Sequence, residues 1–324
     1  MNGWFPGECD RPDPAAALRP LRGLRACHQK SRPHEEGFTG SRSTAVQKPA
    51  VLRDRPHYLK AVDEIYVNDA YHSLSIEGYR VSPELIQRVR TGTWNPDENP
   101  EDRENRNALA ARGYFDAFFG AKASVEKVLG GTNAGRFSRL DHRDWYRPLF
   151  GPSVAAGILR AADLAGYRTG PVYIRRSKQV PPPRDTVRDC MPVLLDLLAN
   201  DPEPAVRVVL GHFVFVYIHP YMDGNGRMGR FLMNVMLASG GYPRTVIPLE
   251  RWNDYMAALE GASVGQDVRA FARFVGDAVE AGLHGRTARP LRAGATRRRA
   301  GTVPLTGIRA GLWRSAPTAP SGRG

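Results

Sequence analysis

The stretch HPYMDGNGRMGRF, residues 219–231, places a histidine, an aspartate, two glycines around an asparagine, and two arginines in one short run. It follows the apolar stretch HFVFVYI, residues 212–218. A polar loop between two helices exposes the unpaired backbone N–H groups of the second helix, whose dipole favours an anion there. Arg227 and Arg230 are three residues apart, so both side chains can point toward the same mouth. The pattern predicts a site for an anion with several charges, and a triphosphate fits better than a single carboxylate.

Other residues of the run complete this chemistry. Gly224 and Gly226 allow the backbone to curl closely around an anion. Asp223 would face the phosphates only with a cation between them, which indicates Mg²⁺ bound through one carboxylate and phosphate oxygens. His219 is the one side chain in the run suited to moving a proton near neutral pH, and the apolar stretch before it would fix its position.

Three other interpretations fit the run less well. It lacks the G-x-x-x-x-G-K-[ST] order of a Walker loop. A zinc site built from His212, His219 and Asp223 would have a His–His spacing of seven, not the four of H-E-x-x-H. Gly-Asn-Gly alone is common turn chemistry, but its fixed order with His219, Arg227 and Arg230 favours a functional site.

The elements that must position this run are mostly predicted helices. Apolar residues recur at helical spacing in residues 59–78, and Ser82 followed by Pro83 predicts a helix start. Asp141 is expected to cap a later helix. Residues 204–218 are apolar almost all round, which is typical of a buried helix. The sequence therefore predicts an all-α fold.

One segment differs from this helical pattern. GYRTGPVYIRRSKQVPPP, residues 166–183 and here named the flap, has Val172, Tyr173, Ile174 and Val180 between Gly-Pro and three prolines. Short apolar runs bounded by such residues predict a short β-hairpin or flap.

The positive charge lies at the two ends of the chain. The formal net charge is +13. Residues 285–324 hold nine arginines and no acid, and residues 1–50 have a surplus of three basic side chains, so residues 51–284 are nearly neutral. We expect both ends to be disordered basic tails that bind nucleic acid only non-specifically.

The composition places the chain among soluble proteins with a substantial core. It is 42% hydrophobic and 24% charged. No segment approaches the ~20 apolar residues that a bilayer span needs, and the first residues lack the order of a signal peptide. We expect a cytoplasmic protein without a membrane partner. The three cysteines have no metal-like spacing, which predicts ordinary free thiols.

The order H-P-[FY]-x-D-G-N-G-R-x-x-R resembles the signature of Fic proteins, a family of mostly α-helical protein adenylyltransferases. Tyr221 stands where phenylalanine is usual. The resemblance covers roughly residues 65–281. Residues 167–183 resemble the family's flap segment, in which Val172 to Lys178 is the part expected to hold the target. It implies an all-α Fic/Fido helical domain with a short β-hairpin flap over the active site. The expected parts of the chain are a disordered tail at 1–50, an N-terminal helical region with the inhibitory motif at 51–137, a Fido catalytic domain at 138–281 and a disordered Arg-rich tail at 285–324.

The resemblance also implies a reaction. His219 would deprotonate a Ser, Thr or Tyr hydroxyl of a target protein, the oxygen would attack the α-phosphate of ATP, and pyrophosphate would leave. Asp223 would hold Mg²⁺, and ATP would be the co-substrate. The implied nucleotide-binding residues are Gly224, Asn225, Gly226, Arg227, Met228, Gly229, Arg230, Trp252 and Tyr255.

Two further roles come from the resemblance. Val172, Tyr173, Ile174 and Arg175 of the flap would hold a target segment by strand-like pairing. SLSIEG, residues 73–78, resembles the inhibitory motif [ST]-x-x-x-E-[GN] of the class with an N-terminal inhibitory helix. Its Glu77 is expected to pair with Arg230, and Ser73 to anchor the helix to the site.

The sequence also allows alternatives to AMP transfer. The same site could remove AMP from a modified protein, with Glu77 orienting water. In a different class, the chain would be a nucleic-acid-binding protein with an inert Fic core. The target could be another protein or the chain itself, and a homodimer is not decided by the sequence.

Overall fold

A computed structural model describes residues 54–94 and 105–284, without the side chains of residues 137–141. Within these ranges the chain forms helices and no strand, which confirms the all-α prediction. None of the helices described is long and apolar enough to cross a bilayer. The predicted tails, 1–50 and 285–324, lie outside the described residues.

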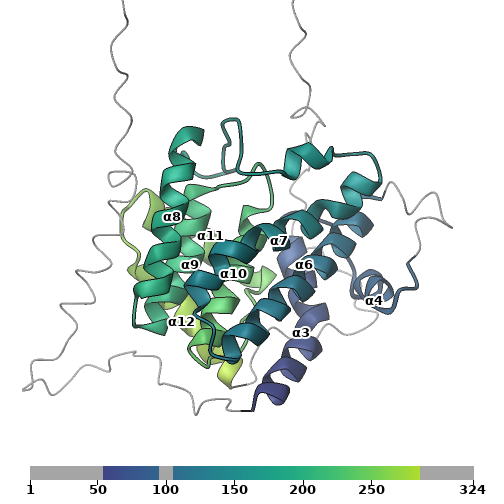
Figure 1. Cartoon of the computed structure of the whole chain (residues 1–324), viewed down its shortest axis with the longest axis horizontal. Coiled ribbons are helices and arrows are strands. Elements are labelled where there is room, and N and C mark those ends of the chain that lie inside the picture. The colour runs from purple at the N-terminus through teal and green to yellow at the C-terminus, as the bar shows by residue number, and fades with distance from the viewer. Residues whose placement is uncertain (1–53, 95–104, 285–324) are drawn as a thin grey trace, which may run out of the picture. The chain divides into compact units, whose positions relative to one another are not determined.

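Figure 1 shows the helices of the described residues in chain order, with the longest described connection between α7 and α8. The α-helices are α3 (Arg55–Ile76), α4 (Pro83–Thr91), α6 (Arg106–Leu129), α7 (Ala134–Ala155), α8 (Arg184–Asn200), α9 (Pro204–Ile218), α10 (Asn225–Ser239), α11 (Trp252–Ser263) and α12 (Arg269–Leu283). Two 3₁₀ turns, η1 (Ala161–Leu164) and η2 (Leu249–Arg251), join some of them.

Helix starts follow local capping chemistry. Ser82 caps α4 as predicted, because its Oγ accepts from the Leu85 backbone N–H at 3.2 Å and Pro83 opens the helix. The expected start at Asp141 is wrong. Helix α7 begins at Ala134, because the side chain of Asn133 already caps it by accepting from the Arg136 N–H at 3.0 Å.

Helices α9 and α10 form the centre that carries the polar run. Helix α10 packs against α9, α6 and α7 (Figure 1). Nearly every residue of α10 is buried. The two central helices approach closely at Gly211, where a Cβ would lie 3.1 Å from the Met236 Cγ. Because both central helices are closely packed, the residues of the loop between α9 and α10 are held in place at both ends.

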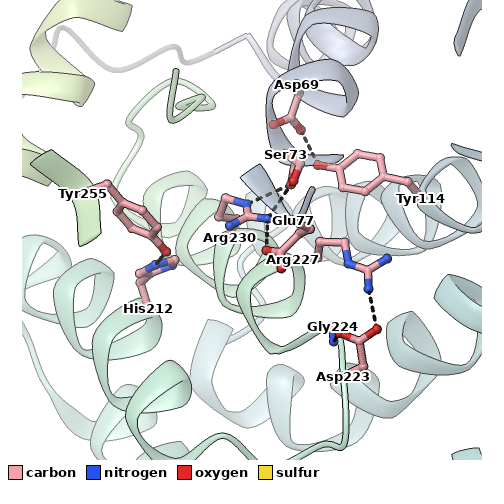
Figure 2. A network of polar contacts seen from close by, with 10 residues as sticks. All are labelled: Asp69, Ser73, Glu77, Tyr114, His212, Asp223, Gly224, Arg227, Arg230 and Tyr255. Atoms are coloured by element: carbon pink, nitrogen blue, oxygen red, sulfur yellow. Dashed lines mark hydrogen bonds and ion pairs between the residues drawn. The ribbon is translucent and has the colours of Figure 1, made fainter. Parts of the chain in front are cut away.

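Helix α3 is part of the same core. It buries apolar side chains such as Tyr58, Leu74 and Tyr66. Its Asp69 accepts from Arg244 at 2.6 Å, with both side chains 4% exposed. Tyr114 of α6 donates to the same carboxylate at 3.2 Å (Figure 2). A buried ion pair thus links α3 to the segment that follows α10.

The flap differs from the predicted β-hairpin. It is drawn near the top of Figure 1 as a narrow loop before α8, and it contains no strand. Ser177 N donates to Ile174 O at 3.1 Å, and Arg176 adopts a left-handed φ of 62°. Strand pairing is limited because prolines remove donors and the N–H of Lys178 donates instead to the Glu260 side chain at 2.7 Å.

The proposed division at 137/138 falls inside α7, whose helical hydrogen bonding crosses it. Helices α6 and α7 also pack against each other along their lengths. We therefore keep the division between an N-terminal region and a catalytic region as a proposal about roles.

The buried Asp69–Arg244 pair gives a stability prediction. Replacing Asp69 by Ala leaves the guanidinium buried without its carboxylate, which typically costs ~3–5 kcal/mol of unfolding free energy. Urea unfolding of the purified full chain measures this loss. The matched control is Glu64→Gln on the same helix, whose exposed partner Lys60 lies 3.9 Å away, and no measurable change is expected there. Equal unfolding free energies for Asp69→Ala and the control would contradict the prediction.

Candidate active site

His219 terminates α9 in a left-handed conformation, with φ 52° and ψ 59°. Its N–H donates to Phe215 O at 3.0 Å, which completes the helix end. A non-glycine residue with positive φ is uncommon. The turn directs the chain away from the buried helix and begins the polar loop.

The side chain of His219 has a defined tautomer. Nδ1 lies 3.0 Å from the Val216 carbonyl oxygen. A carbonyl can only accept, so Nδ1 carries the hydrogen and Nε2 keeps its lone pair. Burial lowers the pKa of His219, and the positive charge of Arg168 lowers it further, whereas the Val216 bond and the charges of Glu77 and Asp223 oppose this. The imidazole is therefore neutral near pH 7, with Nε2 able to accept a proton.

Asn225 shapes the loop from within. Its Nδ2 donates to Tyr221 O at 2.8 Å, and its Oδ1 accepts from Tyr221 N at 2.9 Å. The Tyr221 ring in turn stacks on Tyr146 with centroids 3.7 Å apart. The Asn225 side chain is thus engaged in closing the loop, and its backbone N–H belongs to the first turn of α10, where the anion contact is predicted.

The first turn of α10 forms the predicted backbone nest. Gly224 caps the helix with φ 79°, and a Cβ there would lie 3.0 Å from Phe150. The first bond of the helix runs from Met228 N to Gly224 O at 2.9 Å. The N–H groups of residues 225–227 precede this bond, so helical geometry leaves them without an intrahelical acceptor.

Arg230 joins α10 to the end of α3. Its Nε donates to Ser73 Oγ at 2.8 Å, and its Nη2 donates to Ser73 O at 3.1 Å and to Glu77 Oε1 at 2.7 Å (Figure 2). The predicted pairing of Glu77 with Arg230, and the contact of Ser73 with the site, are both present as geometry.

Arg227 is also buried, but it makes fewer polar contacts. Its guanidinium lies over the rings of Tyr79 and Phe150, 5.2 and 5.0 Å from the centroids. Its Nη2 lies 3.5 Å from Asp223 Oδ2. Nε of Arg227 and Nη1 of Arg230 have no hydrogen-bond acceptor among the described residues, and Nη2 of Arg227 has only the long contact with Asp223. Buried charged donors are normally paired, so these three nitrogens favour an anionic ligand.

The Glu77 carboxylate lies against this same turn. A Cβ built on Gly226 would meet Glu77 Oε1 at 2.4 Å and Arg230 Nη1 at 3.2 Å. Only glycine leaves room for the carboxylate here. One acid of the chain is therefore placed beside the backbone nest, within reach of the guanidinium that an incoming anion would use.

Three predicted nucleotide-binding residues face the core instead. Met228 is buried and its N–H already donates within the helix. A Cβ on Gly229 would lie 3.3 Å from His212 Nδ1, beneath α10. Tyr255 is buried, with its hydroxyl 2.7 Å from His212 Nε2 (Figure 2). A contact with an adenine ring would require Tyr255 to leave this packing. The position of Tyr255 in the sequence, after the helix, gave no sign that its side chain is buried.

Trp252 lies at the start of α11 beside the flap. The Arg176 guanidinium is 5.9 Å from its ring centroid, and Glu260 of the same helix accepts from Ser177 Oγ and Lys178 N. Helix α11 thus holds the second arm of the flap, residues 177–183, whereas residues 166–175 form the first arm.

The arm with the predicted target-binding residues alternates in exposure. Val172 and Ile174 are partly buried, whereas Tyr173 and Arg175 are exposed, Tyr173 by 78%. This alternation is that of an extended segment with one face toward the protein.

Sequence reasoning missed Arg168. Its guanidinium is buried and donates to the carbonyl oxygens of His219 at 2.8 Å, Gly170 at 3.2 Å and Pro182. A single arginine in a loop carries no pattern that could have indicated these contacts.

Asp223 is the carboxylate nearest to the nest on its own loop. Its side chain is 59% exposed, and Oδ1 accepts from the Gly224 N–H at 2.7 Å. The described residues contain no group of three or more His, Cys, Asp or Glu side chains that could hold a metal ion. One exposed carboxylate beside an anion site fits Mg²⁺, which commonly binds through one or two carboxylates plus phosphate oxygens.

The fold and this geometry define an all-α protein with a candidate site for a phosphate-bearing ligand at the start of a buried helix. Residues 143–237 match the model of the Fic/DOC family. The chain therefore contains a Fic/DOC family domain.

Curated relatives share this part of the chain. A protein adenylyltransferase Fic of Nematostella vectensis is 40% identical over 118 residues, covering 35% of this chain and 27% of the relative. A protein adenylyltransferase Fic of Drosophila willistoni is 36% identical over 227 residues, covering 68% of this chain and 41% of the relative. The chain thus spans less than half the length of these relatives.

Solved structures share the fold. Fic-1 (residues 134–508) of Caenorhabditis elegans has a TM-score of 0.56 at 22% identity, covering 84% of this chain and 72% of that one. A Fic family protein of Desulfovibrio desulfuricans has a TM-score of 0.53 at 23% identity, covering 87% and 78%.

The position of Glu77 predicts an effect on anion binding. Glu77→Gln removes a negative charge beside the nest while keeping the side-chain size, and should tighten binding of tripolyphosphate roughly tenfold, since like charges a few ångströms apart near a surface repel by a few kcal/mol at most. Titration calorimetry measures the Kd. Glu64→Gln on α3 is the control and should bind as wild type. Unchanged affinity in Glu77→Gln would place the anion elsewhere.

Proposed function

We propose that this chain is a protein adenylyltransferase that moves AMP from Mg-ATP to a Ser, Thr or Tyr hydroxyl of a target protein. One observation carries the proposal: two features occur together at the α9–α10 junction. His219 is neutral and its Nε2 is an available base, and buried guanidinium nitrogens at the start of α10 lack acceptors. The adenylyltransferase names of the curated relatives support the same chemistry.

His219 acts as general base in this proposal. Its Nε2 takes the proton of the target hydroxyl as that oxygen attacks the α-phosphorus of ATP. The bond from the α-phosphorus to the bridging oxygen breaks, and pyrophosphate leaves with the electron pair. The Val216 carbonyl holds Nδ1–H throughout, so the ring keeps the orientation that Nε2 needs.

The residues around the nest hold the phosphates. Arg227 and Arg230 supply guanidinium donors to the outer phosphates, and the N–H groups of residues 225–227 line the anion site. Asp223 would hold Mg²⁺, which when bound would neutralise phosphate charge and orient the leaving group. Phosphoryl-type transfer depends mainly on such positioning and charge neutralisation.

The flap holds the target in this proposal. An extended target segment lies along residues 172–175 and pairs with their backbone N–H and C=O groups. The alternating exposure of this arm, together with its attachment through the other arm to α11, supports this arrangement.

Glu77 restrains the enzyme. While Glu77 binds Arg230 at 2.7 Å, that guanidinium is less available to the γ-phosphate, and the carboxylate adds repulsion toward ATP. A small misplacement of the α-phosphate can cost ~10²-fold in rate. Ser73 anchors the restraint through its own two bonds to Arg230.

Removal of AMP is the second candidate reaction, with Glu77 orienting a water molecule. It is favoured by the Glu77 carboxylate, which lies against the first turn of α10 and whose charge opposes the lowering of the His219 pKa by burial. Incubating AMP-modified protein with wild type and with Glu77→Gly separates the two candidates. Loss of label with wild type alone would favour removal.

His219→Ala should abolish transfer. Losing a positioned general base typically costs ~10²–10⁴-fold in rate, while ATP binding and folding stay largely intact. The measurement is incorporation of label from α-labelled ATP, in the Glu77→Gly background, followed by mass spectrometry. His57→Ala, an exposed histidine on α3, is the control. Transfer by a folded His219→Ala protein at nearly the rate of the control would contradict the role of His219 as general base.

Glu77→Gly should raise transfer sharply, to the protein itself and to proteins of a cell lysate, because Arg230 is then free to bind phosphate. Adding Arg230→Ala should lower it again, since a phosphate ligand is lost. Labelling at saturating Mg-ATP and equal folded fraction measures both effects. Equal labelling by wild type and Glu77→Gly would refute restraint by Glu77 and leave the role of His219 standing.

A further inference from the structure

Arg168 makes an unusual set of contacts for a buried arginine. Its guanidinium donates to three backbone carbonyls, those of His219, Gly170 and Pro182. Its side chain has no ion pair with a carboxylate of the described residues, unlike Arg230 with Glu77. Burial lowers the pKa of Arg168.

Such a charge is costly to bury, and only its geometry offsets the cost. A guanidinium carries five donors in a rigid planar fork, so one side chain can fix three acceptors relative to one another. Lysine, a point charge on a flexible stem, cannot hold three carbonyls in the same plane.

The first acceptor belongs to the proposed base. His219 has a left-handed backbone, and its carbonyl receives Arg168 Nε at 2.8 Å. The Arg168 backbone N–H also donates to Pro220 O at 2.9 Å. Arg168 therefore holds both peptide groups that follow the imidazole, and with them the direction in which the chain leaves α9.

The other two acceptors lie on the two arms of the flap. Gly170 precedes the target-binding residues, and Pro182 follows the turn. No strand pairing joins the arms within the described flap. Arg168 therefore holds the two arms together at their base, and the same guanidinium also binds the His219 carbonyl.

We propose that Arg168 is a positioning residue that sets the flap and His219 in one fixed arrangement, so that the bound target hydroxyl meets Nε2 of the base. This inference rests on the proposed function, because it concerns the base and the target segment of that reaction. It adds a residue that neither binds the nucleotide nor touches the reacting atoms.

The test uses the full chain with Glu77→Gly, to which Arg168→Lys or Arg168→Met is added. Arg184→Met is the matched control, because Arg184 donates to the neighbouring Thr169 carbonyl at 2.7 Å and not to His219. We expect Arg168→Lys to lower the maximal rate of label transfer ~10²-fold, as expected for a misplaced reacting group. The KM for ATP should stay within about twofold, and Arg184→Met should match its parent.

The pH profile separates position from charge. The groups facing His219 are Arg168 from the flap, Glu77 from α3, absent in this background, and Asp223 from its own loop. Arg168 lowers the pKa of His219, so Arg168→Met should move the acid limb of the rate to higher pH. Arg168→Lys keeps the charge and should leave the limb in place while the rate falls. If the role of Arg168 were purely structural, the acid limb would stay at the parental pH in both variants at equal folded fraction.

A readout without activity distinguishes this proposal from the function on which it rests. The flap carries exposed trypsin sites at Arg175 and Arg176, and Arg168→Lys should speed cleavage there several-fold compared with Arg184→Met. Faster cleavage with no transfer by the Glu77→Gly parent would reject the function but keep the link to the flap. Arg168→Lys with parental transfer and parental cleavage would overturn the proposal. Circular dichroism fixes the folded fraction, and Arg168→Lys serves if Arg168→Met does not fold.

Discussion

The need to satisfy buried guanidinium groups governs this structure. Arg227 and Arg230 lie on the first two turns of α10, a helix that packs against α9, and both side chains are buried. Arg230 finds the hydroxyl and carbonyl of Ser73 and the carboxylate of Glu77, all from α3. Arg227 finds aromatic faces and a long contact with Asp223, and part of its hydrogen-bonding capacity remains unused. Because a buried charge costs several kcal/mol when unpaired, the protein and an anionic ligand compete for the same donors. In the proposed function, restraint by Glu77 and binding of phosphate therefore meet at Arg230.

That competition requires α3 to be held firmly. The Asp69–Arg244 pair lies two helical turns before Glu77 and fastens α3 to the segment after α10. Tyr58, further back, donates to Tyr242 O at 2.9 Å. Both contacts are buried, so α3 behaves as a core helix and not as a detachable arm. In the proposed function, release of Arg230 then calls for only a local change at the helix end, where Gly78 takes a left-handed φ of 87°.

Two different kinds of support meet at His219. The apolar helix α9 fixes where the residue lies, and the Val216 carbonyl fixes which nitrogen is basic. Arg168 holds the outgoing backbone and, in our proposal, positions the flap that would bind a target segment. A general base must lie within hydrogen-bond reach of its proton donor. These contacts supply that precision without any strand in the flap, which explains how a proline-rich loop can serve in place of a hairpin.

The sequence alone determined those features that depend on neighbours along the chain. Helical periodicity, the Ser82 cap, the buried character of residues 204–218 and the polar loop at 219–231 all follow from local spacing, and the Fic resemblance rested on the same short run. The resemblance further anticipated the pairing of Glu77 with Arg230. Tertiary packing decided the rest: that Met228, Gly229 and Tyr255 turn inward, that the flap forms no β-pairs, and that Arg168 joins His219 to the flap. These depend on which groups from distant helices meet and how deeply they are buried. Burial and charge partners arise only when the helices pack, whereas periodicity and capping are complete within a few residues.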